Sequence, residues 1–336
     1  MSARDDRQRG GRAGEGRFAR GLVVGKFLPL HRGHQLVIDA ARAACEHVTV
    51  MTWANPEPSD MPAATRAGWL TALYPDVEVI AFEPDEVPPD DAPDSVQRAF
   101  TRDHLPAPVD AVFTSERYGP GLADVLGCTH VAVDPERARV PTSGTAIRAD
   151  VHAHRHQLDP RVYAHFVTKV VVYGAESTGK STLTLALAEA FETASVEEYG
   201  RTLWEARGGD LPLADYVEIA EGHLALEEAA LLRANRYLFV DTNAITTQQY
   251  AYFFHGACPP RVAELANACA ARYDVSLLCA RDIPYDQDGT RFFEQVQQVQ
   301  DGAIRNDLAI RGIPYTVVGG SVPARVAQVR AMLERP

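Results

Sequence analysis

Residues 173–182 read Tyr-Gly-Ala-Glu-Ser-Thr-Gly-Lys-Ser-Thr, which is the composition of a phosphate-binding loop. An apolar run precedes the stretch and a helix-forming run follows it, so a strand, a glycine-rich turn and a helix are expected in that order. Glycines allow backbone N–H groups to converge on an anion, and the N-terminus of a helix adds a partial positive charge. The residues expected to bind ATP are Gly174, Glu176, Ser177, Thr178, Gly179, Lys180, Ser181 and Thr182.

Two residues of this loop have chemistry of their own. Lys180 can reach the β- and γ-phosphates, and the Ser181 hydroxyl can bind Mg²⁺. Asp241 follows the apolar run 237–240, and an acid at the end of a strand downstream of such a loop fits a carboxylate that organises Mg²⁺. The pattern predicts phosphoryl transfer from a nucleoside triphosphate, but the loop alone does not identify the acceptor.

The acceptor side is expected where the second strand of this half ends. Glu198, Tyr199 and Arg201 follow that short strand, at the place where small-molecule kinases bind their acceptors. An acid there can take the proton of an attacking hydroxyl, and an aromatic ring can stack on a substrate ring. The alternative is the charged start of a helix. Farther on, 282–291 is predicted to be a mobile lid in which Arg291 reaches the transferred phosphoryl group.

A second cluster lies in the first half, at His31-Arg-Gly-His34. The two histidines are three residues apart, so one helical turn places them on the same side. An imidazole can donate hydrogen bonds to phosphate oxygens when it is neutral, and it can offset their charge when it is protonated. The alternative is a pair of histidines that only cap a helix. The neighbouring residues expected to bind the nucleotide are Gly25, Lys26 and Phe27.

A third polar group is formed by Ser143, Thr145 and Arg148. Ser143 or Thr145 suits the N-cap of a helix, and hydroxyl groups together with an arginine can bind a second anion. A plain capped helix is the alternative for this stretch. Arg66 lies three residues before Trp69 in a predicted helix, and it is a further candidate to contact a phosphate or the second substrate.

Short apolar strands alternate with helices along the chain. Strands are predicted over 21–25, 48–53, 77–82, 111–114, 130–133, 169–173, 194–196, 237–240, 275–279 and 316–318. Helices are predicted over 35–45, 63–73, 95–104, 121–126, 181–191, 212–233 and 322–333. The alternation predicts the α/β class with two doubly wound parallel sheets, whose ligands bind at the carboxyl ends of the strands. The predicted parts are a disordered tail over 1–20, a first domain over 21–166 and a second over 167–336.

Composition excludes several classes of protein. The 336 residues are 46% hydrophobic, enough for two domains that each bury a core. A formal net charge of −12 argues against general affinity for nucleic acids or anionic membranes, and no apolar run is long enough to span a bilayer. The N-terminus lacks the apolar core of a signal peptide, and the five cysteines are scattered, so a reduced, cytoplasmic protein is expected. A solvated connector is favoured over a metal site for His152, His154, His156 and His165.

The motifs of the first half resemble the nucleotidyltransferase superfamily. Its signature is G-x-F-x-P-x-H-x-G-H near the start of the domain and S-x-T-x-I-R near its end. The matching residues are Gly25, Phe27, Pro29, His31, Gly33, His34, Ser143, Thr145, Ile147 and Arg148. The resemblance implies a Rossmann-like domain in which a substrate phosphate attacks the α-phosphate of ATP and pyrophosphate leaves. It also implies that the two histidines hold the triphosphate and the developing charge, while the second motif holds the β- and γ-phosphates.

The second half resembles the ribosylnicotinamide kinase domain of the NadR-type bifunctional family. The motifs are the P-loop, E-Y-x-R, D-T-x-x-x-T-T and D-x-P-aromatic-x-x-D-G-x-R, in that order. The matching residues after the loop are Glu198, Tyr199, Arg201, Asp241, Thr242, Thr246, Thr247, Asp282, Pro284, Tyr285, Asp288, Gly289 and Arg291. Because the family has a nicotinamide mononucleotide (NMN) adenylyltransferase domain in front, the resemblance covers about residues 21–334.

This second resemblance implies two reactions. A P-loop kinase domain with ATP and Mg²⁺ would phosphorylate nicotinamide riboside to NMN, with Glu198 or Asp241 orienting the attacking hydroxyl. The first domain would then adenylylate NMN to NAD.

Three departures from the family pattern stand out. The family usually has an acid where Asn243 stands, so metal or ribose binding at that position is in doubt. It usually has a tryptophan where Tyr285 stands, although a tyrosine can still stack on the substrate. Some relatives have a DNA-binding helix-turn-helix module in front, and only about twenty residues precede the first strand here, too few for such a module. No repressor role is expected.

Two other interpretations stay open at this point. The first domain could bind nucleotide without catalysing, beside an active kinase, and release of pyrophosphate from ATP plus NMN distinguishes that case. The chain could instead be a NAD-sensing regulator, which would show no ATP turnover that depends on the riboside. Association with a riboside transporter and assembly into a homo-oligomer are also left open.

Overall fold

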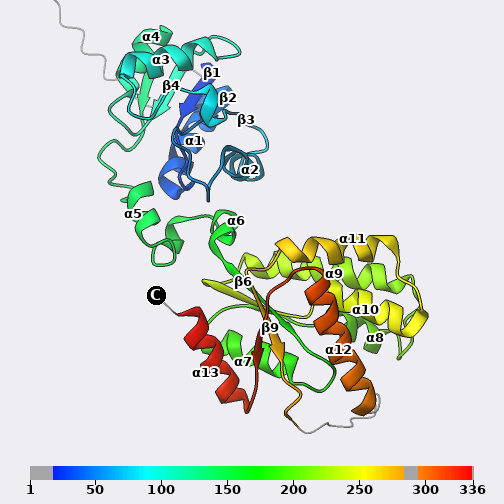
Figure 1. The fold of residues 1–336 in the computed structure, drawn as a ribbon. Helices are drawn as coiled ribbons and strands as arrows, with labels where there is room; N and C mark the ends of the chain where they lie inside the picture. Colours follow the sequence, from blue (N-terminus) through cyan, green and yellow to red (C-terminus); the bar gives the residue numbers. More distant parts are fainter. Residues whose placement is uncertain (1–17, 284–293, 335–336) are drawn as a thin grey trace, which may run out of the picture. The chain divides into compact units, whose positions relative to one another are not determined.

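The computed structural model describes residues 18–283 and 294–334, and Figure 1 shows the fold. The chain divides into two compact units between Val162 and Tyr163, whereas the sequence placed the boundary between 166 and 167. Each unit is built on one five-stranded parallel sheet flanked by helices, so the predicted α/β class with two doubly wound sheets is confirmed. Within the described residues, no helix has both the length and the apolar character needed to cross a membrane.

The first unit contains a compact series of alternating elements. Its strands are β1 Phe18–Val24, β2 Cys45–Thr52, β3 Glu78–Ala81, β4 Ala111–Thr114 and β5 Thr129–Ala132. Its helices are α1 Arg32–Ala44, α2 Ala63–Leu73, α3 Asp94–Asp103, α4 Gly119–Leu126 and α5 Gly144–Ala149, and α6 Pro160–Tyr163 lies at the junction.

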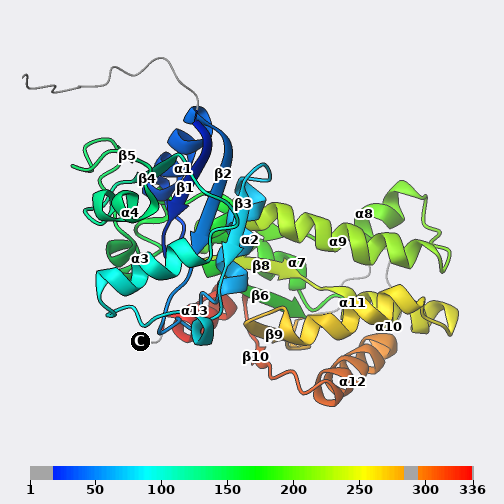
Figure 2. The ribbon, with the colours of Figure 1, turned by 90° about the horizontal axis from the view of Figure 1, so that it is seen from above.

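The strand order of the first sheet is β3-β2-β1-β4-β5, with all neighbours parallel (Figure 2). The order therefore reverses at β1, which lies between β2 and β4. Leu22, Met51 and Val112, one residue from each of these strands, belong to the same buried cluster. In such sheets the crevice for ligands opens at the carboxyl ends of the two strands where the order reverses. Here that places a site beyond the ends of β1 and β4.

The second unit repeats this plan with longer helices. Its strands are β6 Thr168–Tyr173, β7 Ser195–Val196, β8 Tyr237–Asp241, β9 Val275–Cys279 and β10 Thr316–Val318. Its helices are α7 Lys180–Ala190, α8 Tyr199–Ala206, α9 Asp215–Leu231, α10 Ala244–His255, α11 Pro260–Ala268, α12 Glu294–Ile310 and α13 Val322–Leu333.

The second sheet has the order β10-β9-β6-β8-β7, again parallel throughout. Successive residues of a strand point to opposite faces, and β6 shows this clearly. Val170 and Val172 pack with residues of α7 and α13, while Val171 and Tyr173 pack with residues of α8 to α12. Figure 1 shows α7 and α13 on one side of this sheet and α10, α11 and α12 on the other. The order reverses at β6, so the loop that follows β6 opens at the crevice.

Most predicted elements agree with the structure within a few residues, but α10 and α11 were not predicted. The sequence of α10, Ala-Ile-Thr-Thr-Gln-Gln-Tyr-Ala-Tyr-Phe-Phe-His, has no clean apolar stripe of helical period, and it is rich in β-branched and aromatic residues. Tertiary packing overrides that weak local preference, since Ile245 and Ala251 are buried in the core. The helix α12 begins at Glu294, directly after the segment predicted to be a lid, and was also missed.

The last residues of the first unit, within the stretch predicted to be a solvated connector, are partly buried. Leu158 and Val162 are 3% and 0% exposed, and Leu158 forms an isolated antiparallel bridge with His31. The Arg161 guanidinium donates to the Ala72 carbonyl at 2.9 Å. This stretch therefore packs onto the first unit because its apolar residues complete that core. Among the described residues, no group of three or more histidines, cysteines or acids is placed to hold a metal ion.

Candidate active sites

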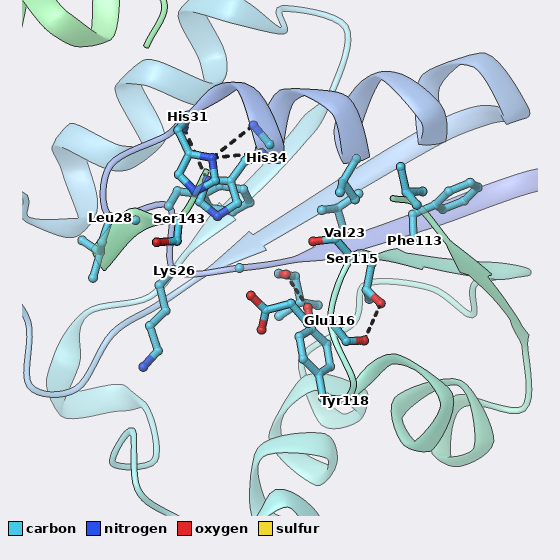
Figure 3. A pocket seen from close by; sticks show the side chains of 18 of the residues that line it. Val23, Lys26, Leu28, His31, His34, Phe113, Ser115, Glu116, Tyr118 and Ser143 are labelled. Atoms are coloured by element: carbon cyan, nitrogen blue, oxygen red, sulfur yellow. Dashed lines mark hydrogen bonds between the residues drawn. The ribbon is translucent and has the colours of Figure 1, made fainter. Parts of the chain in front are cut away.

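The turn between β1 and α1 brings two imidazole rings together (Figure 3). His31 is the N-cap of α1, and its Nδ1 accepts the backbone N–H groups of Gly33 at 3.1 Å and His34 at 3.4 Å. The Nδ1 of His34 accepts the N–H of His31 at 3.4 Å. The rings are stacked, with centroids 3.7 Å apart. Because a nitrogen that accepts an N–H has no proton of its own, both neutral rings have their proton on Nε2, on the opposite side of each ring.

Both histidines are held neutral. Burial lowers the pKa of His31 to about 4, and the charge of Arg137 acts in the same direction. Burial, followed by the influence of His31, lowers the pKa of His34 well below its usual value. Of the two roles predicted for these rings, the structure favours that of neutral hydrogen-bond donor. The predicted alternative of helix capping is also present, because His31 caps α1 through Nδ1, and His31 also lines the cavity.

The rings lie at a cavity of about 700 Å³. In Figure 3 the stacked rings lie near Ser143, with Lys26, Glu116 and Tyr118 drawn around the same pocket. The predicted residues that line the cavity are Gly25, Lys26, Phe27, His31, His34, Ser143, Thr145 and Arg148. The two motifs, more than a hundred residues apart in sequence, thus line one cavity beyond the ends of β1 and β4.

Gly144 explains how the second motif comes this close to the first. A Cβ atom at Gly144 would lie 2.6 Å from the Leu28 carbonyl oxygen, so a side chain at this position would force the two segments apart. Arg148 donates to the same carbonyl and, at 3.4 Å, to the Thr145 hydroxyl. Ser143 caps α5 by accepting the N–H of Ala146 at 3.2 Å. The motif therefore fastens the β1–α1 turn as well as lining the cavity.

Arg66 is the one predicted residue of the first unit that does not reach the cavity. Its side chain is fully buried and pairs with Glu57. It also donates to the Thr52 hydroxyl at 2.9 Å and to the carbonyl oxygens of Lys26 and Met61 at 3.1 Å each. These acceptors take four of the five N–H groups, and the buried side chain does not line the cavity, so the prediction of a phosphate or substrate contact is corrected to a structural position. Removing one partner of a buried ion pair typically costs about 3–5 kcal/mol.

Several cavity residues were missed by sequence reasoning. Trp53 follows β2 and Glu116 lies just beyond β4, so the rule that parallel strands present ligand-binding residues at their carboxyl ends could have found both. Arg137 lies in the loop after β5, and nothing in its local sequence marks it. Lys26, by contrast, was predicted, and its ammonium pairs with Asp90 at 2.7 Å.

The glycine-rich loop after β6 lies between a strand and a helix, as expected, and two of its glycines have positive φ angles. Gly174 and Gly179 have φ angles of 157° and 81°. A Cβ at Gly174 would lie 2.5 Å from the Thr178 hydroxyl, so only glycine fits there. The α7 helix starts at Lys180, whose ammonium donates to the Ala175 carbonyl at 3.1 Å. Lysine, loop backbone and helix N-terminus are thus assembled as a phosphate site requires.

Glu176 is the exception in this loop. Its backbone N–H donates to Gln300 at 3.1 Å, and its carbonyl accepts from Gln297 at 2.9 Å. Gln300 of α12 therefore occupies the Glu176 N–H, which was expected to face a phosphate, while Gln297 holds the carbonyl of the same residue. The Glu176 carboxylate instead accepts from the Tyr250 hydroxyl of α10 at 3.5 Å.

Asp241 ends β8, the strand beside β6, and is 1% exposed. Within the described part of the chain, neither carboxylate oxygen has a hydrogen bond of normal geometry. Burial raises the pKa of Asp241, while the charge of Lys180 and the hydroxyl of Ser181 oppose the shift. An unsatisfied buried carboxylate beside a hydroxyl fits a hard divalent cation such as Mg²⁺. Asp241 and Ser181 would hold it, with water and phosphate oxygens as further ligands, as is usual for this ion.

Carboxylates gather on the acceptor side of the loop. Burial raises the pKa of Glu198, the residue that precedes α8, and Asp241 adds to the shift, whereas Lys180 and Arg201 oppose it. Burial and the nearby charges of Glu198, Glu176 and Asp241 raise the pKa of Tyr250 far above its usual value. The structure therefore brings the predicted acids together around Lys180, and it adds Tyr250, which sequence reasoning missed.

The remaining predicted residues are placed differently. The ring of Tyr199 lies against Gly222 of α9, where a Cβ atom would come within 2.6 Å of the ring. The ring is therefore part of the packing between α8 and α9. Asn243 caps α10 through the N–H of Ile245 at 2.9 Å and donates to the Tyr173 hydroxyl at 2.7 Å, so it has a structural position. Tyr285 and Arg291 lie outside the described residues, and their predicted roles stay predictions.

Comparisons with known proteins show which families this chain resembles. Residues 169–325, which include the glycine-rich loop, match a protein-family model described as an AAA domain. The trifunctional NAD biosynthesis/regulator protein NadR of Escherichia coli (strain K12) is 31% identical over 295 residues, which cover 81% of this chain and 71% of the relative. The protein of the same name from Salmonella typhimurium (strain LT2) is 30% identical over 293 residues, with the same coverage.

Two solved structures share the fold over nearly the whole chain. A crystal structure of NadR protein in complex with NR superposes with a TM-score of 0.68 at 22% identity, covering 94% of this chain and 96% of that one. A crystal structure of NadR protein in complex with NAD and AMP-PNP gives a TM-score of 0.67 at 20% identity, covering 95% and 97%.

Proposed function

The chain belongs to the NadR family, and we propose that it catalyses two consecutive steps of NAD biosynthesis. In the first step, the second unit transfers the γ-phosphoryl group of ATP to the 5′-hydroxyl of nicotinamide riboside, giving NMN and ADP. In the second step, a phosphate oxygen of NMN attacks the α-phosphorus of ATP in the first unit, giving NAD and pyrophosphate. The observation that carries this proposal is the presence of two separate strand–turn–helix sites, one in each unit.

The kinase proposal is supported by the groups around Lys180. The lysine lies at the N-terminus of α7, where it can neutralise charge on the transferred phosphoryl group. Glu198 is the better general base, because it is half-buried and its raised pKa makes it a stronger proton acceptor than an ordinary glutamate. Asp241 is almost fully buried and suits Mg²⁺, which when bound neutralises the developing charge on the phosphates.

The adenylyltransferase proposal is supported by the stacked histidines. Neutral Nε2–H groups can donate to oxygens of the α-phosphate and stabilise the extra charge of the transition state. Positive charge around the cavity comes instead from Lys26, Arg137 and Arg148, all of which line it. No covalent intermediate is needed, since the two substrates react directly once they are aligned.

Product analysis tests both steps at once. The full chain is incubated with ATP, Mg²⁺ and nicotinamide riboside, and the products are followed by mass spectrometry. We expect NMN to appear first and NAD to follow, with one ADP and one pyrophosphate formed for each NAD. NMN that accumulates without NAD would favour a kinase beside an inactive nucleotide-binding unit. ATP turnover that never responds to the riboside would favour a NAD-sensing protein and would contradict the kinase proposal.

A further inference from the structure

Arg325 of α13 is a buried arginine that donates hydrogen bonds to the loops at the carboxyl ends of three strands. Arg325 is 2% exposed, and its Nη1 donates to the Thr178 carbonyl of the glycine-rich loop at 2.6 Å. Its Nε donates to the Gly320 carbonyl at 3.0 Å, and its Nη2 donates to the Ala280 carbonyl at 3.3 Å and pairs with Asp282. One guanidinium therefore joins the loops that follow β6, β9 and β10.

The contact with Thr178 acts on the part of the loop that faces a phosphate. A peptide unit is planar and trans, so fixing the direction of the Thr178 carbonyl also fixes the opposite direction of the Gly179 N–H. Gly179 has a φ of 81°, and a Cβ there would lie 3.3 Å from Ile283 and 3.6 Å from Arg325. Lys180 and the first turn of α7 follow directly. Arg325 thus sets the orientation of the peptide that leads into the phosphate-binding helix.

Asp282 completes this arrangement. Its second carboxylate oxygen accepts the Gly320 N–H, so the acid is tied to the backbone as well as to the arginine. A planar guanidinium can satisfy several acceptors in fixed directions, whereas an ammonium group cannot reproduce that geometry. The network therefore needs an arginine, and a positive charge alone would not be enough.

The same helix offers a built-in comparison. Arg330 also joins α13 to α7, but it donates to the Ala190 carbonyl at 2.7 Å, at the end of α7 remote from the glycine-rich loop. It pairs with Glu334 and is half exposed. If Arg325 only held α13 against the rest of the second unit, replacing either arginine should have a similar effect.

Building on the proposed riboside kinase, we propose that Arg325 is a positioning residue of that site, which holds the glycine-rich loop in its triphosphate-binding conformation through the Thr178 carbonyl. Arg325 itself acts through the loop backbone. Its removal should weaken the use of ATP and leave the use of the riboside unchanged.

Steady-state kinetics of the full chain separate these effects. We expect Arg325→Lys to raise the KM for ATP in riboside phosphorylation by about tenfold or more, since small misplacements of binding groups cost up to about 10²-fold. The KM for the riboside and the adenylyltransferase rate of the first unit should stay within about threefold of the parent. Arg330→Lys is the matched control and should leave all of these values unchanged. Asp282→Asn, which keeps the shape of the network, should give an intermediate rise.

Hydrogen exchange provides a readout that does not depend on the acceptor. In the parent, ATP should protect the amides of 176–182, and in Arg325→Lys the same protection should need about tenfold more ATP. A parent that phosphorylates no riboside would refute the proposed kinase, yet the ATP titration of these amides would still decide the role of Arg325. An unchanged KM for ATP and an unchanged titration in Arg325→Lys would overturn the inference. An equal rise of the KM for ATP in Arg330→Lys would show that both arginines only hold α13 in place, and it would also overturn the inference. Faster amide exchange throughout the second unit of Asp282→Asn and Arg325→Lys would have the same meaning.

Discussion

The turn after β1 and the loop after β6 share one layout, but different groups hold them. The first is fastened by its own two histidines, which accept backbone N–H groups within the turn, and by Arg148, which donates to the Leu28 carbonyl. The second is held from a distance, by Gln297, Gln300 and Arg325 of α12 and α13. The first presents neutral N–H donors from two rings, and the second presents a lysine, glycine backbone and a helix N-terminus. One strand–turn–helix geometry therefore presents two different sets of groups, and under the proposed function these act at the inner and at the terminal phosphorus of ATP.

The largest expected effect is that of Lys180→Ala, which should abolish one proposed reaction and leave the other unchanged. Lys180→Ala should lower riboside phosphorylation by about 10³-fold, because charge on the transferred group loses its main protein counter-ion. The conversion of NMN to NAD by the same chain should not change. Lys169→Ala, at the start of β6, is the control and should leave both rates near the parent values. Full kinase activity in Lys180→Ala would show that the β6 loop is not the phosphoryl-transfer site.

The next effect tests whether the histidines act as neutral donors. His34→Asn should lower NAD formation by about 10²-fold, because its amide cannot reach the position of Nε2. His34→Gln places an amide N–H near that position and should recover much of the loss. The exposed His47 provides the control substitution, His47→Ala. Equal losses in the Asn and Gln variants would count against a donor role, and kinase activity should be unchanged in all three proteins.

Acid should weaken the first unit through His31. The folded pKa of about 4 lies below the unfolded value of 6.5, so the unfolded state binds more protons between these values. The free energy of unfolding should therefore fall as the pH drops from about 6.5 to 4, with a contribution from His31 of about 3 kcal/mol. Hydrogen exchange of β1 and α1 across this range measures the slope. His31→Gln should make the slope shallower and leave the part that comes from His34, whereas a slope identical to the parent would contradict the buried neutral state.

The buried His223 of α9 provides the matched control in the second unit. Burial lowers its pKa to about 4 as well. His223→Gln should therefore flatten the acid dependence of the second unit while leaving that of β1 and α1 unchanged.

The pH dependence of catalysis should differ between the units. Burial raises the pKa of Glu198, so riboside phosphorylation should lose rate on the acid side at pH values above the ordinary 4.5 of a glutamate. NAD formation should lack this limb, since its histidines are already neutral there. Profiles of kcat/KM for both reactions in one preparation provide the measurement. Glu198→Gln should remove the limb together with most of the rate, and a limb that survives would move the base to another group.

The smallest effect concerns the departure at Asn243. Asn243→Asp keeps the oxygen that caps α10. Its second oxygen replaces the amide that donates to the Tyr173 hydroxyl, so the hydroxyl has to turn and donate instead, and kinase rates should change by less than about threefold. Kinetics and the thermal midpoint check this. A large gain in kinase activity would mean that Asn243 weakens the active site, and it would contradict the purely structural role described above.

What could be predicted from sequence follows the same contrast. The histidine turn and the glycine-rich loop depend on residue types at short spacing, so Gly25 to His34 and Gly174 to Ser181 were recognisable. Arg325 and Gln297 contact the loop from 147 and 121 residues away, and nothing near them in sequence indicates that contact. Arg66 was misjudged for the same reason, since its acceptors converge only in the folded unit. The position of Asp241 at the end of β8, beside the β6 loop, was predictable because strand ends in parallel sheets have a fixed place.

Because Leu158 pairs with the backbone at His31, the histidine turn is not complete until the chain beyond the last motif of the first half has left the ribosome. A fragment that stops after Arg148 would contain every signature residue of the first half but lack the buried side chains of Leu158 and Val162. Because the core of the first unit would then be incomplete and partly exposed, such a fragment should aggregate, whereas one that extends through Val162 should fold by itself. Gene fusions or dissections of this enzyme would therefore have to cut between the units and not at the edge of the motif.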